Sequence, residues 1–255
     1  MQAMSLYVNK DTVVHKIDPI SKIVYVIASI AIPFILPSIL ETLICLAVSV
    51  IFIFLGRIFI KVLPLIGYSS LILITIVMIQ GLFHPGNETA LFRIGPLVFY
   101  KEGLTFAGLI CLRVINILCA FSLLILTTKP SALIEELVRR GLSPKIGYVL
   151  SSVLQIIPQM TATMGTITDA QRSRGMETEG NLFKRMRAFV PLMGPVVMNA
   201  LIQTRERAMA LEVRGFSTKG ARTFYNERHS FRYGIFIQIS LVIIVILAIV
   251  WRIVK

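Results

Sequence analysis

The stretch IVYVIASIAIPFILPSILETLICLAVSVIFIFLG, residues 23–56, carries one charged side chain, that of Glu41, and is interrupted near its middle by Pro33 and Pro37. A helix needs about 20 apolar residues to cross a hydrocarbon layer roughly 30 Å thick. Two helices that meet at the prolines would each be slightly shorter than that. The stretch therefore predicts a hairpin of two short membrane helices, with a tilted or re-entrant arrangement as the alternative.

The rest of the chain fits the same setting. Of its 255 residues, 56% are hydrophobic and only 15% are charged, and the mean hydropathy of +0.80 is far above that of a soluble domain. Three further apolar runs, over residues 62–83, 103–128 and 233–251, are long enough to span. We therefore expect an all-α integral membrane protein with about five transmembrane helices in a lipid bilayer. The segment HPGNETALFRIGPLVFYKE, residues 84–102, predicts a loop with a short amphipathic piece.

Charge is distributed unevenly along the chain. The 26 Lys and Arg residues outnumber the 13 Asp and Glu residues, and most of the basic ones lie in residues 129–232. In a membrane protein such an excess collects on the cytoplasmic side, and this interpretation is preferred to a nucleic-acid partner. We therefore divide the chain into an N-terminal membrane domain of about four spans (residues 1–128), a helical cytoplasmic domain (129–232) and a last transmembrane helix (233–255).

The topology depends on two borderline segments of the cytoplasmic domain. Residues 146–168 are uncharged but rich in Ser, Thr and Gln, and residues 188–202 are short and contain two prolines. If both segments crossed the bilayer, the basic residues between them would lie outside, against the positive-inside bias. If neither crosses, the basic domain and the N-terminus lie inside and the C-terminus lies outside. The other basic residues that then lie inside are Lys10, Lys16, Lys22, Arg57 and Lys61.

A short pattern, Ala-x-x-x-Arg-Gly, occurs twice in the cytoplasmic domain. The copies are AQRSRG at residues 170–175 and ALEVRG at residues 210–215. A glycine after a helical run is typical of the left-handed residue that ends a helix, and an Arg in the last turn suits the negative end of the helix dipole. Two ordinary helix ends are therefore one interpretation. The other is that two short helices each present a planar, five-donor Arg side chain to a partner protein.

With these two copies the chain resembles the transmembrane T component of energy-coupling factor transporters (EcfT, with the related cobalt and nickel transport protein CbiQ), a class of ABC importers. The resemblance runs nearly end to end, and the paired pattern is its most specific part. The matching motifs are DPISK at 18–22, HPG at 84–86, Arg113, TTKP at 127–130, GLSP at 141–144, IIP at 156–158, AQRSRG and LEVRG. The sequence departs from the family at Ser173 and Val213, where Ala is common, and at Gln155, where Arg is common.

The resemblance implies a role for each copy of the pattern. Two ABC ATPase subunits would dock beneath the chain, which would couple their ATP hydrolysis to a substrate-binding membrane S component for vitamin or metal-ion uptake. Arg174 and Arg214 would each insert into a groove of one ATPase. The coupling residues that carry over are Ala170, Ser173, Arg174, Gly175, Ala210, Val213, Arg214 and Gly215. The implied location is the cytoplasmic membrane of a prokaryotic cell.

We expect no catalytic residues, cofactor or metal site in this chain. No G-x-x-x-x-G-K-[ST] phosphate loop is present, so ATP and Mg would be bound by the partner subunits. An intramembrane enzyme is disfavoured because His15, His84 and His229 lie in separate segments and no H-E-x-x-H or G-x-S-x-G occurs. A stand-alone permease with its own substrate site is the alternative function, for which internal repeats with broken helices would be expected.

Arg113 lies inside the fourth apolar run, where a charge costs about 2.5–3.5 kcal/mol on insertion scales. One interpretation is that Arg113 and Asn116, nearly one turn further on, make a functional contact with the S component or within the membrane. The other is that the Arg113 side chain extends to the outer surface, as long basic side chains near helix ends do.

Overall fold

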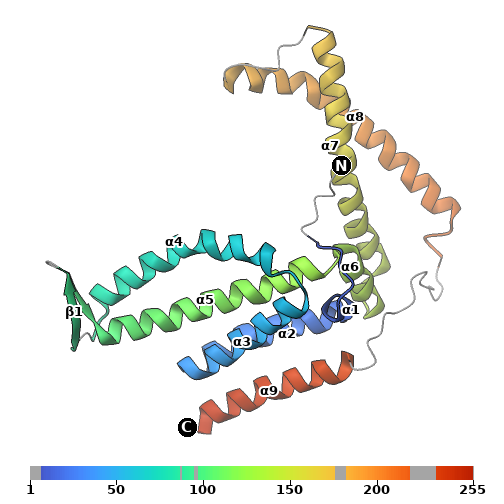
Figure 1. Cartoon of the computed structure of the whole chain (residues 1–255). Coiled ribbons are helices and arrows are strands. Elements are labelled where there is room, and N and C mark those ends of the chain that lie inside the picture. The colour runs from blue at the N-terminus through green and yellow to red at the C-terminus, as the bar shows by residue number, and fades with distance from the viewer. Residues whose placement is uncertain (1–6, 87, 95–96, 176–181, 219–233, 255) are drawn as a thin grey trace. The chain divides into compact units, whose positions relative to one another are not determined.

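The chain divides into two compact units in the computed structural model (Figure 1). We call Ser5–Arg140 with Arg228–Lys255 the membrane unit, and Gly141–Glu227, with which Met1–Met4 are grouped, the platform unit. The division falls after Arg140, so that the segment from residue 129 to residue 140 belongs to the membrane unit. The residues that the structure describes are 7–86, 88–94, 97–175, 182–218 and 234–254.

The predicted spans correspond to five apolar helices of the membrane unit. These are α2 (Pro19–Ile35), α3 (Ile39–Leu55), α4 (Phe59–Phe83), α5 (Lys101–Thr127) and α9 (Gly234–Val254). Among the described residues, α4, α5 and α9 are long and apolar enough to cross a membrane. Helices α2 and α3 have 17 residues each, which rise about 26 Å at 1.5 Å per residue. The two short apolar helices of the predicted hairpin are therefore present.

The turn between α2 and α3 is encoded locally. Leu36 has an extended backbone, as expected of a residue that precedes a proline. Ser38 is the N-cap of α3, and its side chain accepts a hydrogen bond from the Leu40 amide at 3.3 Å. Two short helices, α1 (Val13–Lys16) and α6 (Pro130–Arg139), precede α2 and follow α5.

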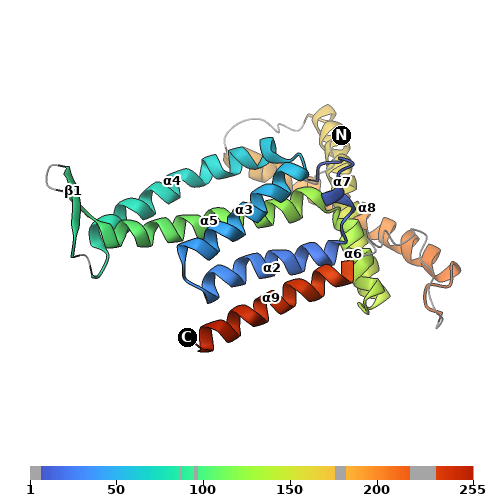
Figure 2. The same ribbon diagram turned by 60° about the horizontal axis from the view of Figure 1, so that its bottom comes forward.

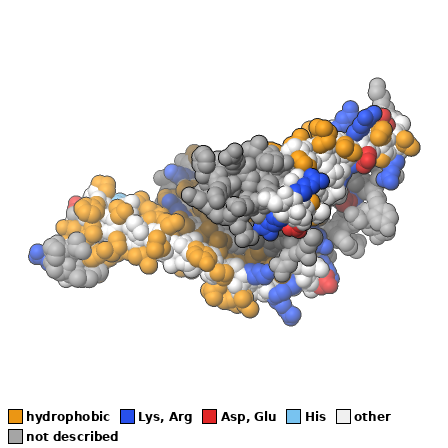
Figure 3. Space-filling view, turned by 90° about the horizontal axis from the view of Figure 1, so that it is seen from above, with side chains coloured by type: hydrophobic (Ala, Val, Ile, Leu, Met, Phe, Trp, Pro, Cys, Tyr) orange, Lys and Arg blue, Asp and Glu red, His pale blue; other side chains and the backbone are white. Residues whose placement is uncertain are grey.

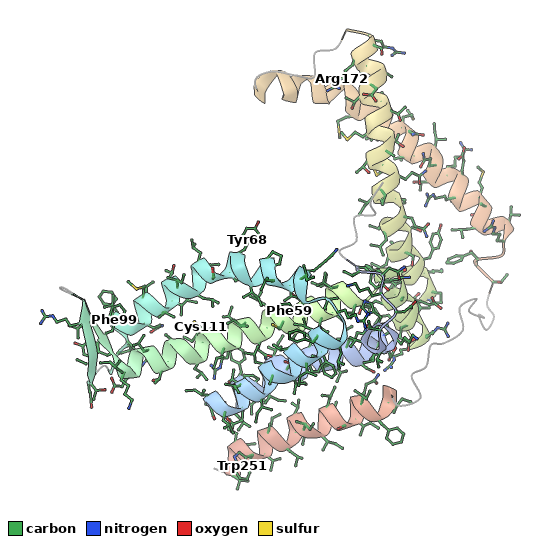
Figure 4. All side chains as sticks on the ribbon, viewed as in Figure 1. Phe59, Tyr68, Phe99, Cys111, Arg172 and Trp251 are labelled. Carbon is green, nitrogen blue, oxygen red and sulfur yellow. The ribbon has the colours of Figure 1, made fainter. Side chains whose placement is uncertain are left out.

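A β-hairpin occupies the segment for which the sequence predicted a loop with an amphipathic piece, so that prediction was wrong. Strands β1 (Ala90–Ile94) and β2 (Leu97–Tyr100) pair antiparallel, with Ala90 opposite Tyr100. Both strands are rich in the aromatic and branched residues that favour strands, whereas the Gly-Pro pair at 95–96 lies outside the described residues. The hairpin packs on α4 through Phe99 of β2 (Figure 4). The contact is close: a Cβ atom added at Gly81 of α4 would lie only 3.1 Å from Phe99 Cδ1.

Helix α5 forms the centre of the membrane unit, where it packs against α2, α3 and α4. The buried apolar cluster at its C-terminal end consists of Val14, Ile53, Ile58, Val62, Cys119, Leu123 and Leu126. By contrast, α4 exposes most of its apolar side chains, including Tyr68, which is 83% exposed. The space-filling view shows these hydrophobic side chains along the part of the surface formed by α4 and α5 (Figure 3). Such a surface suits a lipid or membrane-protein environment.

Helix α9 lies beside α2 (Figure 2) and is joined to it by polar contacts near both ends. Near its start, Gln238 Nε2 donates to Asp18 Oδ2 at 3.1 Å and to Ser21 Oγ at 2.8 Å. Near its end, the Arg252 guanidinium donates to the carbonyl oxygens of Phe34 at 3.0 Å and Ile35 at 2.7 Å. Arg252 thereby satisfies carbonyl groups that the last turn of α2 would leave without a partner.

The platform unit contains two long helices, α7 (Pro144–Ser173) with 30 residues and α8 (Leu182–Val213) with 32. The sequence-based expectation of two short helices was therefore wrong. Helix α8 runs through the whole of the short segment with two prolines, residues 188–202, including Gly194 and Pro195. The ribbon of α8 bends along its length (Figure 1), and a Gly-Pro pair inside a helix accounts for a bend rather than a break because the missing amide removes one hydrogen bond.

Candidate functional site

The first copy of the repeated pattern ends α7. Helix α7 stops at Ser173, Arg174 is its C-cap, and Gly175 has a φ of +87°. The Gly175 amide donates to the Arg172 carbonyl at 2.9 Å, and the Arg174 amide donates to the Gln171 carbonyl at 3.1 Å. The prediction of a left-handed glycine that terminates the helix is confirmed.

The second copy ends α8 in a complete Schellman motif. Gly215 has a φ of +68°. Its amide donates to the Glu212 carbonyl at 2.9 Å, and the Phe216 amide donates to the Leu211 carbonyl at 3.0 Å. The Phe216 ring also packs on Tyr148 of α7, with ring centroids 5.2 Å apart. No role was predicted for Phe216, because an apolar residue directly after such a glycine signals a contact with the last turn of its own helix, not with a second helix.

Each copy presents the same kind of surface. In a helix, residues at positions i, i+3 and i+4 lie on one face. The residues at these positions are Ala170, Ser173 and Arg174 in the first copy, and Ala210, Val213 and Arg214 in the second, and all six are exposed. Val213 is 89% exposed, which is unusual for an apolar residue in the last turn of a long helix. Each helix end therefore offers a small-residue face beside an exposed guanidinium.

The two helix ends are far apart within the platform unit. Helices α7 and α8 are joined where Arg207 Nη2 donates to Gln159 Oε1 at 2.7 Å, and again where Phe216 meets Tyr148. The C-terminal end of α8 therefore lies beside the start of α7. Arg174 follows Tyr148 by 26 positions on α7, which corresponds to about 39 Å along a helix. The two copies form two separate sites rather than one.

A third Arg-Gly pair, which the sequence analysis did not single out, provides an internal comparison. Arg140 follows α6, and Gly141 has a φ of +112°. The Arg140 guanidinium donates to Asp18 Oδ2 at 3.0 Å, to Gln238 Oε1 at 3.1 Å and to Glu136 Oε1 at 3.4 Å. This side chain ties α6 to α2 and α9. Among the described residues, no comparable hydrogen bond is seen for the guanidinium groups of Arg174 and Arg214.

Neutral replacement separates an arginine with internal hydrogen bonds from one without them. We expect Arg140→Gln to lower the free energy of unfolding by about 1–2 kcal/mol, because it removes charge-assisted hydrogen bonds to Asp18 and Glu136. Arg174→Gln and Arg214→Gln should change it by less than about 0.5 kcal/mol, since these are exposed positions that make no such bond among the described residues. Thermal unfolding of the purified variants in one detergent measures this difference, and equal loss in all three would contradict it.

The left-handed glycines can be tested directly. Gly175→Val should destabilise the end of α7 by about 1–2 kcal/mol, because a branched residue is strained at a φ of +87°. Gly175→Asn should cost much less, since Asn tolerates this conformation. Apart from the adjoining backbone, no described residue has an atom within 4 Å of the position that a Cβ would occupy, so the constraint is the backbone conformation. Hydrogen exchange of the last turn of α7 would report the effect, and equal exchange in both variants would contradict it.

The structure gives Arg113 and Asn116 different partners. Arg113 Cζ lies 5.1 Å from the centre of the Phe34 ring, and its Nε has no hydrogen-bond partner among the described residues. Asn116 is fully buried; its Nδ2 donates to the Ser29 carbonyl at 2.8 Å and its Oδ1 accepts from Ser29 Oγ at 3.2 Å and from Ser49 Oγ at 2.9 Å. Asn116 therefore links α5 to α2 and α3, while Arg113 stacks on α2.

The described residues contain no group of three or more His, Cys, Asp or Glu side chains that could hold a metal ion. The thiols of Cys45, Cys111 and Cys119 are free. Cys119 belongs to the apolar cluster of the membrane unit, which suits its role as a small buried hydrophobic residue.

Comparisons with known proteins agree with this arrangement. Residues 10–225 match the family model CbiQ, described as cobalt transport protein. The energy-coupling factor transporter transmembrane protein EcfT of Lactococcus lactis subsp. cremoris is 30% identical to this chain, over 97% of each. The EcfT proteins of Streptococcus equi subsp. equi and Heliobacterium modesticaldum are 31% and 33% identical, over 85–86% of this chain and 85% of theirs. The chain therefore belongs to the CbiQ family, as a transmembrane component of the energy-coupling factor type.

Proposed function

We propose that this chain is the non-catalytic coupling subunit of an energy-coupling factor transporter, and that each of its two Arg-Gly helix ends docks one ATPase subunit. The observation that carries the proposal is the pair of exposed Arg side chains, Arg174 and Arg214, at two structurally equivalent helix ends. ATP and Mg would be bound by the ATPase subunits, and a separate S component would bind the vitamin or metal ion that is taken up.

The distance between the two helix ends supports two docking partners. About 39 Å along α7 exceeds the roughly 30 Å diameter of a small domain, so the two ends suit two separate partners. An Arg that is always charged and has five donors can pair bidentately with a carboxylate or bond to several carbonyl groups in a partner's groove. The exposed small face beside each Arg lets the partner approach closely.

The long helices also suggest how motion is transmitted. Helices α7 and α8 contact each other through Gln159 and Arg207, and again through Tyr148 and Phe216. When ATP binding closes the ATPase pair, a shift of one helix end would therefore change the crossing of the two helices. Packed helices move as levers in such transitions. The exposed apolar surface of α4 is available for the S component or for lipid.

The positive-inside bias supports an orientation in which the platform unit and the N-terminus lie in the cytoplasm and the C-terminus lies outside. The membrane would be the cytoplasmic membrane of a prokaryotic cell. In this orientation the Arg-Gly helix ends face the compartment that contains ATP.

The experiment that tests the proposal is native mass spectrometry of the tagged chain after mild-detergent extraction from its own membrane. We expect a complex that contains two ATPase subunits with phosphate-loop motifs and one small hydrophobic membrane protein. Recovery of the chain by itself, with binding of a transported solute in the absence of partners, would instead support the stand-alone permease.

A further inference from the structure

A cavity of about 560 Å³ lies in the membrane unit, where two motifs of the sequence come together. DPISK supplies Asp18 and Lys22 to its lining, and TTKP supplies Thr127, Thr128 and Lys129. The polar segment before α2 forms the other wall. The volume of the cavity is within the range of sites that bind small molecules.

The lining is cationic. Lys10, Lys16, Lys22 and Lys129 line the cavity, against Asp11 and Asp18. Asp18 already accepts hydrogen bonds from Arg140 and Gln238, so its charge is largely compensated by a cation outside the lining. Burial lowers the pKa of His15, which is therefore neutral at pH 7, and its ring nitrogens contact Thr12 Oγ1 and the Val8 carbonyl. The net positive charge thus comes from the lysines.

The fold holds three of the four lysines in place, while the fourth, Lys16, is exposed. Lys22 Nζ is held against the Thr127 carbonyl at 3.0 Å, Lys10 Nζ against the Arg57 carbonyl at 2.8 Å, and Lys129 Nζ lies 5.2 Å from the centre of the Tyr7 ring. These contacts are with uncharged groups, and Asp18, which attracts Lys22, is shared with Arg140. Ammonium groups held near one cavity by uncharged contacts form a preorganised site for an anion.

A second observation points to a ligand in the same place. Thr128, which lines the cavity, is only 8% exposed, and its Oγ1 is buried without a hydrogen-bond partner among the described residues. A buried hydroxyl without a partner costs about 1–3 kcal/mol. An anion in the cavity could accept its hydrogen bond and remove that cost.

The level of the cavity along the helices suggests where the anion comes from. Helix α5 ends at Thr127 and α2 begins at Pro19, so the cavity lies at the ends of two apolar helices. In a bilayer, the ends of apolar helices lie at the level of the lipid headgroups. Basic pockets at this level between membrane helices are typical binding sites for anionic headgroups.

We propose that this cavity binds the phosphate group of an anionic phospholipid, with Lys16 and Lys129 supplying charge and Thr128 supplying a hydrogen bond. The proposal concerns the membrane unit alone and does not depend on the docking of ATPases. A soluble phosphate monoester has the same chemistry, and the experiment distinguishes the two sources.

The test is native mass spectrometry of the detergent-purified full chain, titrated with phosphatidylglycerol, phosphatidylcholine or glycerol phosphate. We expect one phosphatidylglycerol molecule to bind per chain, and to bind more tightly than phosphatidylcholine. Lys16→Gln with Lys129→Gln should weaken this binding about thirty-fold, from about 1 kcal/mol per basic residue. Thr128→Val should weaken it about ten-fold through loss of one hydrogen bond to a charged group, and it removes no bond made within the described protein.

The matched control is Lys61→Gln with Lys145→Gln, which removes two exposed lysines that do not line the cavity. This control should bind phosphatidylglycerol within about two-fold of the original chain, since surface charges outside the cavity are screened by solvent and salt. Equal weakening by the control and the cavity variants would overturn the proposal. Binding of glycerol phosphate as tightly as phosphatidylglycerol would overturn the lipid source.

Discussion

Replacement of Arg174 and Arg214 together by Glu is expected to abolish ATP-driven uptake while the chain still inserts in the membrane. Both side chains are exposed at helix ends, so the folded chain loses no internal contact of the described residues. Loss of one partner from a buried, hydrogen-bonded charge pair at an interface costs about 2–5 kcal/mol. Each ATPase subunit loses one such contact, which weakens its binding by about thirty-fold or more, and the introduced carboxylates would also be repelled by any acidic groove.

The measurement is solute uptake by proteoliposomes that contain the whole transporter, together with the amount of ATPase that co-purifies. The matched control is Lys145→Glu with Arg205→Glu, which makes the same change of charge at exposed positions of α7 and α8. The control should retain most uptake. Normal uptake by the variant with both Arg174 and Arg214 replaced would contradict the coupling role. An equal loss of uptake in the control would show that the effect comes from the change in net charge.

Replacement of Asn116 by Leu is expected to lower the free energy of unfolding by about 1–3 kcal/mol, with the lower part of that range more typical of polar contacts between membrane helices. Leu has nearly the shape of Asn but can neither donate nor accept. The change therefore removes the hydrogen bond from Asn116 Nδ2 to the Ser29 carbonyl. It also removes Asn116 Oδ1, which accepts hydrogen bonds from the Ser29 and Ser49 hydroxyl groups. These bonds join α5 to both helices of the short hairpin.

Ser122→Ala on the same helix is the matched control. Ser122 is 5% exposed, but its Oγ has no hydrogen-bond partner among the described residues. Because a buried hydroxyl without a partner is unfavourable, its removal should not lower the free energy of unfolding. Denaturant titration of both variants in the same detergent gives the comparison. Equal stability of the two variants would show that the Asn116 bonds do not hold the three helices together.

Much of the fold could be predicted because it depends on contiguous residues. The apolar runs set the five membrane helices, and Pro37 and Ser38 set the turn of the hairpin. Gly175 and Gly215 adopt the left-handed conformation that their place after a helical run predicts. The lengths of α7 and α8 were underestimated, since the expectation was two short helices whereas they have 30 and 32 residues.

The sites were harder to predict because they join distant residues. Arg140-Gly141 also ends a helix with a left-handed glycine, yet its guanidinium binds Asp18, which lies 122 positions away. The Arg-Gly pair by itself does not tell an arginine that holds the fold together from one that is exposed for a partner. Likewise, the strand pairing of residues 90–100 competes with a loop, and the packing of Phe99 near Gly81 favours the hairpin.

By itself the sequence determined that this is an all-α membrane protein with a basic domain and two Arg-Gly helix ends, since hydrophobicity, charge and helix termination are properties of short segments. Only the tertiary structure decided that the two ends lie far apart on crossing helices, that Asn116 ties three helices together, and that lysines of two motifs line one cavity. The physical reason is that these contacts depend on which helix faces pack against each other, which no short segment specifies.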